Sequence, residues 1–154
     1  MASLIQASTP EHWSSARRLI EAYAASLDVD LCFQGFDEEL RELSTRYGPP
    51  EGALLLAPGE SAYVGCVALH RWSADSCEMK RLYVAPEGRG HGLGRTLTEA
   101  VIAEARRIGY ARMLLDTLPS MREAQGLYRS LGFVPVTAYR PNPVPGSLFL
   151  ELAL

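Results

Sequence analysis

The chain has 154 residues, of which 47% are hydrophobic and 21% are charged, and its formal net charge is −3. This length supports a single domain over residues 1–154 that is built around one core. The slightly acidic balance argues against a protein that binds nucleic acid or an anionic membrane surface. No stretch approaches the roughly 20 consecutive apolar residues of a membrane span, so we expect a cytoplasmic protein without a membrane partner.

The first half of the chain predicts one strand, two helices and then three antiparallel strands. A short strand is expected at 3–8. Thr9 and Pro10 then supply an N-cap and a first helical position for an amphipathic helix at 11–27. A shorter helix fits 37–47. The apolar runs at 53–58, 61–72 and 76–86 predict the three strands, the first two of them joined as a hairpin.

The second half alternates helices and strands. A helix is expected at 95–109, a strand at 111–118, a helix at 121–132, and two closing strands at 133–140 and 147–154. Glycines follow both helical patterns, which is typical of helix C-termini. This order predicts a mixed α/β domain with helices on both faces of one sheet.

The three cysteines carry no metal-site signature. Cys32, Cys66 and Cys77 are widely spaced, with no Cys-x-x-Cys pair and no histidine at ligand spacing. We therefore interpret them as small buried hydrophobic side chains and expect no metal.

Four glycines lie within seven residues, at Gly88, Gly90, Gly92 and Gly94, between a predicted strand and a predicted helix. The spacing does not fit the Gly-x-Gly-x-x-Gly fingerprint of dinucleotide-binding folds from any starting glycine. A Walker A loop is also a poor match, because Arg95 stands where that loop has lysine. The remaining pattern is Arg89-x-x-Gly92-x-Gly94 at a helix start, where bare backbone N–H groups and the helix dipole favour a diphosphate.

A second segment, "AQGLYRSLGF" at 124–133, strengthens this reading. Together the two motifs resemble those of the GNAT N-acetyltransferases, whose pyrophosphate loop is Gln/Arg-x-x-Gly-x-Gly/Ala. The resemblance implies a splayed mixed sheet and acetyl-CoA as the cosubstrate. It assigns the pyrophosphate to Arg89, Gly90, His91, Gly92, Leu93, Gly94 and Arg95, and the pantetheine amides to main-chain groups of Leu82, Tyr83 and Val84.

The same resemblance suggests two catalytic side chains. Tyr128, also counted as a coenzyme contact, would protonate the CoA sulfur; the alternative is an ordinary core tyrosine. Glu78 lies eleven positions before Arg89, the offset of the catalytic glutamate in Gcn5-like members, and would act as base directly or through water. Strand alternation would place Glu78, Lys80, Leu82 and Val84 on one face. A solvated edge carboxylate paired with Lys80 is the alternative.

Two loops are candidates for binding the acceptor. Phe33, Gln34 and Phe36 lie in the first interhelical loop, which in GNAT enzymes covers the acceptor site. Tyr139, Arg140 and Asn142 lie in a proline-rich loop, where Arg140 would favour an acceptor that carries a carboxylate. Plain loop packing would also explain all six residues. His12 and His70 have no partner at useful spacing, so we expect both at the surface.

We therefore predict transfer of an acetyl group from acetyl-CoA to the primary amine of a small molecule or peptide, by direct attack. Many family members have asparagine where this chain has Met121, which removes one expected CoA contact. That departure keeps open an alternative, a CoA-binding regulatory module with weak or lost catalysis. The leucines of the last predicted strand favour a homodimer. The identity of the acceptor stays open.

Overall fold

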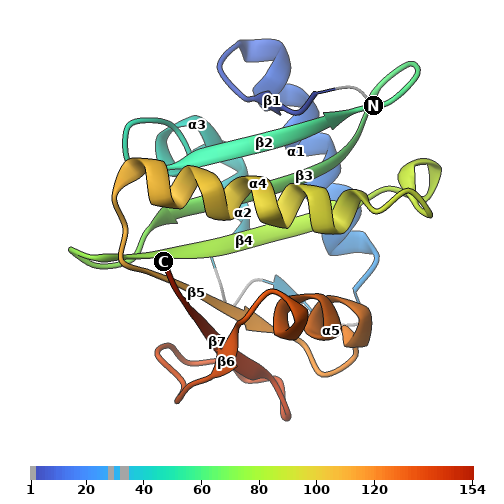
Figure 1. Ribbon diagram of the computed structural model, residues 1–154. Coiled ribbons are helices and arrows are strands. Elements are labelled where there is room, and N and C mark those ends of the chain that lie inside the picture. Colours follow the sequence, from blue (N-terminus) through green and yellow to red (C-terminus); the bar gives the residue numbers. More distant parts are fainter. Residues whose placement is uncertain (1–2, 28–29, 32–34) are drawn as a thin grey trace.

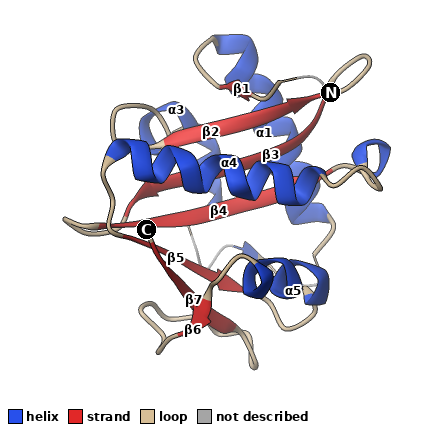
Figure 2. Cartoon of the chain, in the orientation of Figure 1, coloured by secondary structure: helices blue, strands red, loops and turns tan. Residues whose placement is uncertain are grey.

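Seven strands form one open sheet in the computed structural model, which describes residues 3–27, 30–31 and 35–154 (Figures 1 and 2). The strand order is β1-β2-β3-β4-β5-β7-β6. The strands span Ile5–Gln6 (β1), Ala53–Pro58 (β2), Tyr63–Arg71 (β3), Ser76–Val84 (β4), Arg112–Thr117 (β5), Val134–Pro135 (β6) and Leu148–Ala153 (β7). All neighbours pair antiparallel except β4 and β5, which are parallel. The predicted mixed α/β class and element order are confirmed.

Helices cover both faces of the sheet. The helices span Pro10–Ala25 (α1), Phe36–Arg41 (α2), Leu43–Arg46 (α3), Leu93–Ile108 (α4) and Arg122–Ser130 (α5), and a 3₁₀ turn spans Pro86–Gly88 (η2). In Figure 1, α4 crosses one face of β2, β3 and β4 while α1 lies behind the same strands. Within the described residues, no helix is both long and apolar enough to cross a membrane.

Local sequence signals fix the ends of the two long helices. Thr9 caps α1, its hydroxyl accepting a hydrogen bond from the His12 backbone N–H at 3.2 Å, and Pro10 is the first helical residue, as predicted. His12 completes this cap because its Nδ1 accepts from the Thr9 N–H at 3.2 Å. Gly109 ends α4 with φ 109°, a left-handed conformation that favours glycine.

Two predicted elements differ from those observed. The single helix expected at 37–47 is divided into α2 and α3 at Glu42, which has φ −124° and ψ 26°. The strand expected at 133–140 pairs only over Val134–Pro135. Pro135 has no N–H to donate to the ladder, and after the Val136 N–H, which donates to the Phe149 carbonyl at 2.8 Å, the chain leaves the sheet as a loop.

The sheet divides between β4 and β5. These strands pair only where Ser76–Glu78 faces Arg112–Leu114, and no pairing continues toward Val84 and Thr117. Figure 1 shows β5 and β7 turning away from β4 beyond that point. The opening leaves a gap at the carboxyl ends of two parallel strands, where ligands bind in open α/β sheets.

A bulge in β4 changes the face on which its side chains lie. Arg81 has φ 61°, and the register with β3 shifts between Cys66 and Ala68. Before the bulge, Met79 packs in the cluster beneath α4; after it, Leu82 and Val84 pack against the same cluster. The prediction that Leu82 and Val84 share a face with Glu78 and Lys80 is therefore wrong, because the extra residue inverts the alternation.

Candidate functional site

A groove of about 920 Å³ runs from the end of β4 across the start of α4 to α5. This volume lies near the upper end of the range found for pockets that bind small molecules and cofactors. Its walls come from the C-terminal end of α1, the end of β4, the glycine loop and the start of α5. The lining residues include Leu82, Tyr83, Val84, Arg89, Gly90, Gly92, Leu93 and Gly94.

The groove ends on the exposed N-terminus of α4. Gly92 is the N-cap with φ 73°, and no side chain caps the first turn. A Cβ added at Gly92 would meet nothing within 4 Å, and one at Gly94 would meet only Leu127 Cδ2 at 3.9 Å. Packing within the protein therefore does not require glycine at Gly92 or Gly94, although φ 73° favours glycine at Gly92. The two glycines keep the first N–H groups of the helix open to an anionic group.

The groove unites most of the residues expected to hold a coenzyme, with three exceptions, of which Tyr128 lines the neighbouring cavity instead. His91 is exposed and does not line it. Arg95 does not line it either, because its guanidinium donates to Ser130 Oγ at 2.7 Å on α5. Arg89 lines the groove, but its Nε donates to the Val84 carbonyl at 3.0 Å, which bends the side chain back toward β4.

Sequence reasoning missed the contributions of α1 and of the first turn of α5. Tyr23, on α1, lines both the groove and the cavity beside it. Ser120, Arg122 and Glu123 add polar groups to the groove opposite the glycine loop. Only the splay of the sheet brings these distant segments together, so no local pattern marks them.

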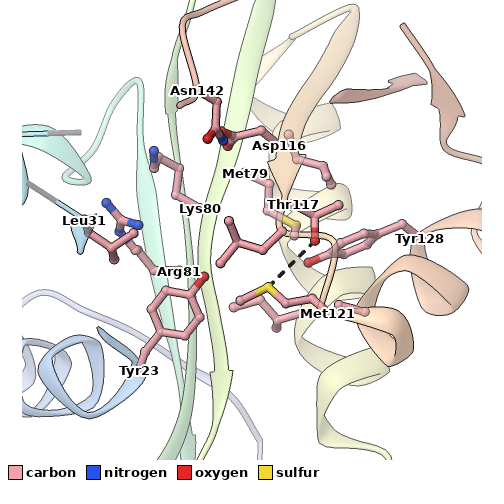
Figure 3. Close-up of a pocket in the computed structure, with 14 residues that line it drawn as sticks. Tyr23, Leu31, Met79, Lys80, Arg81, Asp116, Thr117, Met121, Tyr128 and Asn142 are labelled. Carbon is pink, nitrogen blue, oxygen red and sulfur yellow. Dashed lines mark hydrogen bonds between the residues drawn. The ribbon is translucent and has the colours of Figure 1, made fainter. Parts of the chain in front are cut away.

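A smaller cavity of about 60 Å³ lies in the gap between β4 and β5 (Figure 3). Tyr128 enters it from α5, and its hydroxyl lies on the side of Thr117 and Met121. Met121 lines both spaces and accepts a hydrogen bond from Thr117 Oγ1 at 3.7 Å on its sulfur. Burial raises the pKa of Tyr128, so its hydroxyl keeps its proton through the neutral range.

Glu78 does not line this cavity. Its side chain is fully buried and accepts hydrogen bonds from Tyr139 (2.7 Å), Arg140 (2.6 Å) and His70 (2.8 Å). The sequence left open a solvated carboxylate at the sheet edge as the alternative role of Glu78, and its burial shows that it is not solvated. The expectation that His70 has no partner is also wrong, because β3 places it directly opposite Glu78.

This network makes Glu78 a strongly held anion. Burial alone would raise its pKa, but the hydrogen bond with His70, the charges of Lys80 and Arg140 and the Tyr139 hydroxyl together lower it to about 2. A lowered pKa means that the carboxylate stabilises the fold fully above its unfolded pKa of about 4.3. That contribution disappears as the pH falls toward 2.

We expect Glu78→Gln to remove this pH dependence. Parent stability should fall between about pH 5 and pH 2 more steeply than that of the variant, because only the parent must protonate a buried carboxylate. Urea unfolding at several pH values measures both slopes. Glu87→Gln, at an exposed position in η2, is the matched control and should follow the parent. If the free energy of unfolding of Glu78→Gln and of the parent fell equally with pH, the result would contradict the network.

The two acceptor-loop predictions have different outcomes. Tyr139 and Arg140 point to Glu78, and Arg140 also stacks over Trp72 at 4.7 Å. Only Asn142 lines the smaller cavity, where its amide donates to Asp116 Oδ2 at 3.1 Å. Phe36 begins α2 and packs 5.3 Å from the Arg81 guanidinium. Phe33 and Gln34 lie outside the described residues.

Residues 16–133 match the acetyltransferase (GNAT) family. The chain is 39% identical to an uncharacterised N-acetyltransferase of Schizosaccharomyces pombe, over 94% of this chain and 90% of the relative. An acetyltransferase from Streptococcus agalactiae has the same fold, with a TM-score of 0.79, 23% identity and full coverage of both chains.

A GNAT acetyltransferase from Elizabethkingia anophelis, solved with acetyl-CoA bound, aligns over 68% of this chain and 77% of its own, with 24% identity and a TM-score of 0.57. The match to the family model extends from α1 through the glycine loop to the end of α5, and so includes both motifs singled out in the sequence. The chain therefore belongs to the acetyltransferase (GNAT) family and is an N-acetyltransferase.

Proposed function

We propose that this enzyme transfers the acetyl group of acetyl-CoA to a primary amine by direct attack within a ternary complex. The observation that carries the proposal is that the long groove and the smaller cavity are adjacent and share lining residues. The long groove ends on an uncapped helix N-terminus suited to a pyrophosphate, and it meets the smaller cavity at Met121 and Leu82. A thioester bound where the groove meets the smaller cavity would face an amine bound between β4 and β5.

In the proposed reaction, the amine nitrogen attacks the thioester carbonyl carbon, and the C–N bond forms as the C–S bond breaks. The thiolate takes a proton from the Tyr128 hydroxyl, and the nitrogen releases one of its own protons to solvent water. Tyr128 suits this role because it lines the cavity and stays protonated at neutral pH. Tyr128 then regains its proton from solvent.

Glu78 suits an indirect role better than direct proton abstraction. Its oxygens already accept three hydrogen bonds, and its pKa of about 2 makes it a weak base. We propose that it acts through its partners, by holding the loop that carries Tyr139 and Arg140. A covalent route through Cys77 is unfavourable, since that thiol is fully buried and burial raises its pKa to about 12.

Two measurements on the purified protein test the proposal. Acetyl-CoA should raise the melting temperature by mass action, whereas Mg-ATP should not. Thiol release from acetyl-CoA should then increase when an amine panel of amino acids, alkylamines and peptides is added. Stabilisation by Mg-ATP alone would overturn the coenzyme assignment. Acetyl-CoA binding without turnover on any amine would favour the regulatory alternative.

Gly94→Ala should separate ligand binding from folding. Gly94 lies in the first turn of α4, where alanine is favoured over glycine by about 0.5–1 kcal/mol, so the free energy of unfolding should rise. The new methyl group would project into the groove, and we expect acetyl-CoA affinity to fall by about tenfold or more, equivalent to roughly 1.4 kcal/mol.

Gly126→Ala is the matched control, because Gly126 lies within α5, has open space around it and does not line the groove. It should stabilise the protein without changing the affinity. Calorimetric titration of both variants checks the comparison. Equal affinities would show that Gly94 has no role at the ligand.

We also propose a homodimer, although β7 cannot be its edge. β7 pairs with β5 on one side and β6 on the other, so the outer strand is β6. Val134 on that strand is 55% exposed, so β6 presents an apolar side chain at its edge of the sheet, the other edge being β1. Light scattering at micromolar concentration tests this assembly, and a monomeric mass would exclude it.

A further inference from the structure

The junction between the long groove and the smaller cavity contains a single type of side-chain hydrogen-bond donor. Four of the described residues line both spaces: Tyr23, Leu82, Met121 and Ala124. Leucine, methionine and alanine side chains have no N–H or O–H group, whereas tyrosine has a hydroxyl. Of the side chains shared by the two spaces, Tyr23 is therefore the one that can donate a hydrogen bond to a ligand lying across them.

The last turn of α1 places Tyr23 at this junction. Ala16 and Ile20 belong to the buried face of the helix, and Tyr23 follows them on that face at helical spacing. Its ring packs edge-on against Tyr83 of β4, with the centroids 6.0 Å apart and the planes at 65°. The helix and the strand together hold the ring beside the opening in the sheet.

Tyr23 and Tyr128 lie on opposite sides of the smaller cavity (Figure 3). Burial raises the pKa of Tyr128, and the nearby Tyr23 adds to that shift, so the two phenols are close enough to interact. They differ in position, because Tyr23 also lines the groove and Tyr128 does not. A thioester that enters from the groove would pass Tyr23 before it reaches Tyr128.

The Tyr23 hydroxyl has a proton to donate. Across residues 3–27, 30–31 and 35–154, no side chain or backbone group forms a hydrogen bond with it. Burial raises its pKa; the charge of Arg81 opposes that shift, and the charge of Asp116 adds to it. A tyrosine with a raised pKa stays protonated at neutral pH and acts as a donor.

Building on the proposed function, we propose that Tyr23 stabilises the carbonyl oxygen of the thioester during acetyl transfer. As the amine nitrogen attacks the carbonyl carbon, the C=O π electrons move onto the oxygen, which accepts a hydrogen bond from the Tyr23 hydroxyl. Tyr23 keeps its proton throughout. The electrons then re-form the C=O bond as the C–S bond breaks, and the departing thiolate takes the proton of Tyr128. A donor already in place where negative charge develops lowers the barrier of the chemical step.

Infrared difference spectra of bound acetyl-CoA, labelled with ¹³C at the acetyl carbonyl, test this contact without an acceptor. A hydrogen bond polarises the carbonyl and weakens its C=O bond, so the band of the coenzyme bound to Tyr23→Phe should lie at higher wavenumber than with the parent. The band with Tyr128→Phe should coincide with that of the parent. Coincident bands for Tyr23→Phe and parent would overturn the inference, and failure of the parent to bind acetyl-CoA would overturn the proposed function as well.

Steady-state kinetics provide a second readout, on an amine identified by the panel. Tyr23→Phe should lower kcat by roughly 10–100-fold, the usual contribution of a hydrogen bond to a charged group, with little change in KM for acetyl-CoA. The phenylalanine ring keeps the packing against Tyr83, so the fold should be retained. An unchanged kcat would overturn the role of Tyr23 and leave the proposed function intact. No turnover by the parent on any amine would overturn both.

Tyr63→Phe is the matched control. Tyr63 lies on β3 and lines neither the groove nor the smaller cavity. Removing its hydroxyl should leave kcat, KM for acetyl-CoA and the carbonyl band as in the parent. An equal loss of kcat in Tyr63→Phe and Tyr23→Phe would mean that the loss reflects a general effect of removing a hydroxyl, which would refute the assignment.

Discussion

Tyr128→Phe should lower kcat by about 10²–10⁴-fold, the usual contribution of general acid catalysis, while acetyl-CoA affinity stays nearly unchanged. The substitution removes one hydroxyl from the cavity and little volume. The ring would still pack against Phe133, whose centroid lies 5.6 Å away. Because burial raises the pKa of Tyr128, that group does not titrate between pH 6 and 9. The loss should therefore be the same across this range, and steady-state rates at several pH values measure it.

Two other tyrosines provide the comparison. Tyr110 donates its hydroxyl to the Glu51 carbonyl at 2.5 Å and belongs to the same core cluster as Tyr128, but it lines neither space. Tyr110→Phe should lower stability and leave kcat unchanged. Tyr23 lines both spaces, so Tyr23→Phe tests whether the acid comes from α1 instead. A larger loss of kcat in Tyr23→Phe than in Tyr128→Phe would reassign the acid.

Features set by local chemistry could be predicted from the sequence. Thr9 and Pro10 begin α1 as expected, and Gly109 ends α4. The glycine loop lies between β4 and α4, as its spacing indicated. These features depend on residues within a few positions of one another, and capping, turn geometry and hydrophobic periodicity are visible at that range.

Features that depend on contacts across the fold could not be predicted from the sequence. The bulge at Arg81 follows no local signal, because arginine has no preference for φ 61°. Its partner Glu39 is 42 positions away, and the partners of Glu78 in the C-terminal loop are 61 and 62 positions away. Such pairs form only after the sheet has brought β4 against α2 and the loop. For the same reason, the sequence could not show that Arg140 pairs with Glu78 and does not line the cavity between β4 and β5.

The Arg81–Glu39 pair should have the largest effect on stability. Glu39 is 1% exposed and Arg81 is 5% exposed, and they form two hydrogen bonds of 2.8 Å between α2 and the bulge of β4. Removing one member of a buried pair leaves the other charge without its main partner and typically costs about 3–5 kcal/mol. We expect Glu39→Met to lose that much. Arg81→Met should lose less, because Arg46 lies 3.8 Å from Glu39 and partly compensates it.

The double variant distinguishes a buried pair from two independent residues. With both charges replaced by methionine, no uncompensated charge remains, so the loss should be well below the sum of the two single losses. Backbone strain at position 81 stays the same throughout, because arginine and methionine both carry a Cβ at φ 61°. Urea unfolding of the parent, the two single variants and the double variant completes this double-mutant cycle. Additive losses would mean that the pair is not coupled, and α2 would then be held against the bulge by its apolar contacts alone.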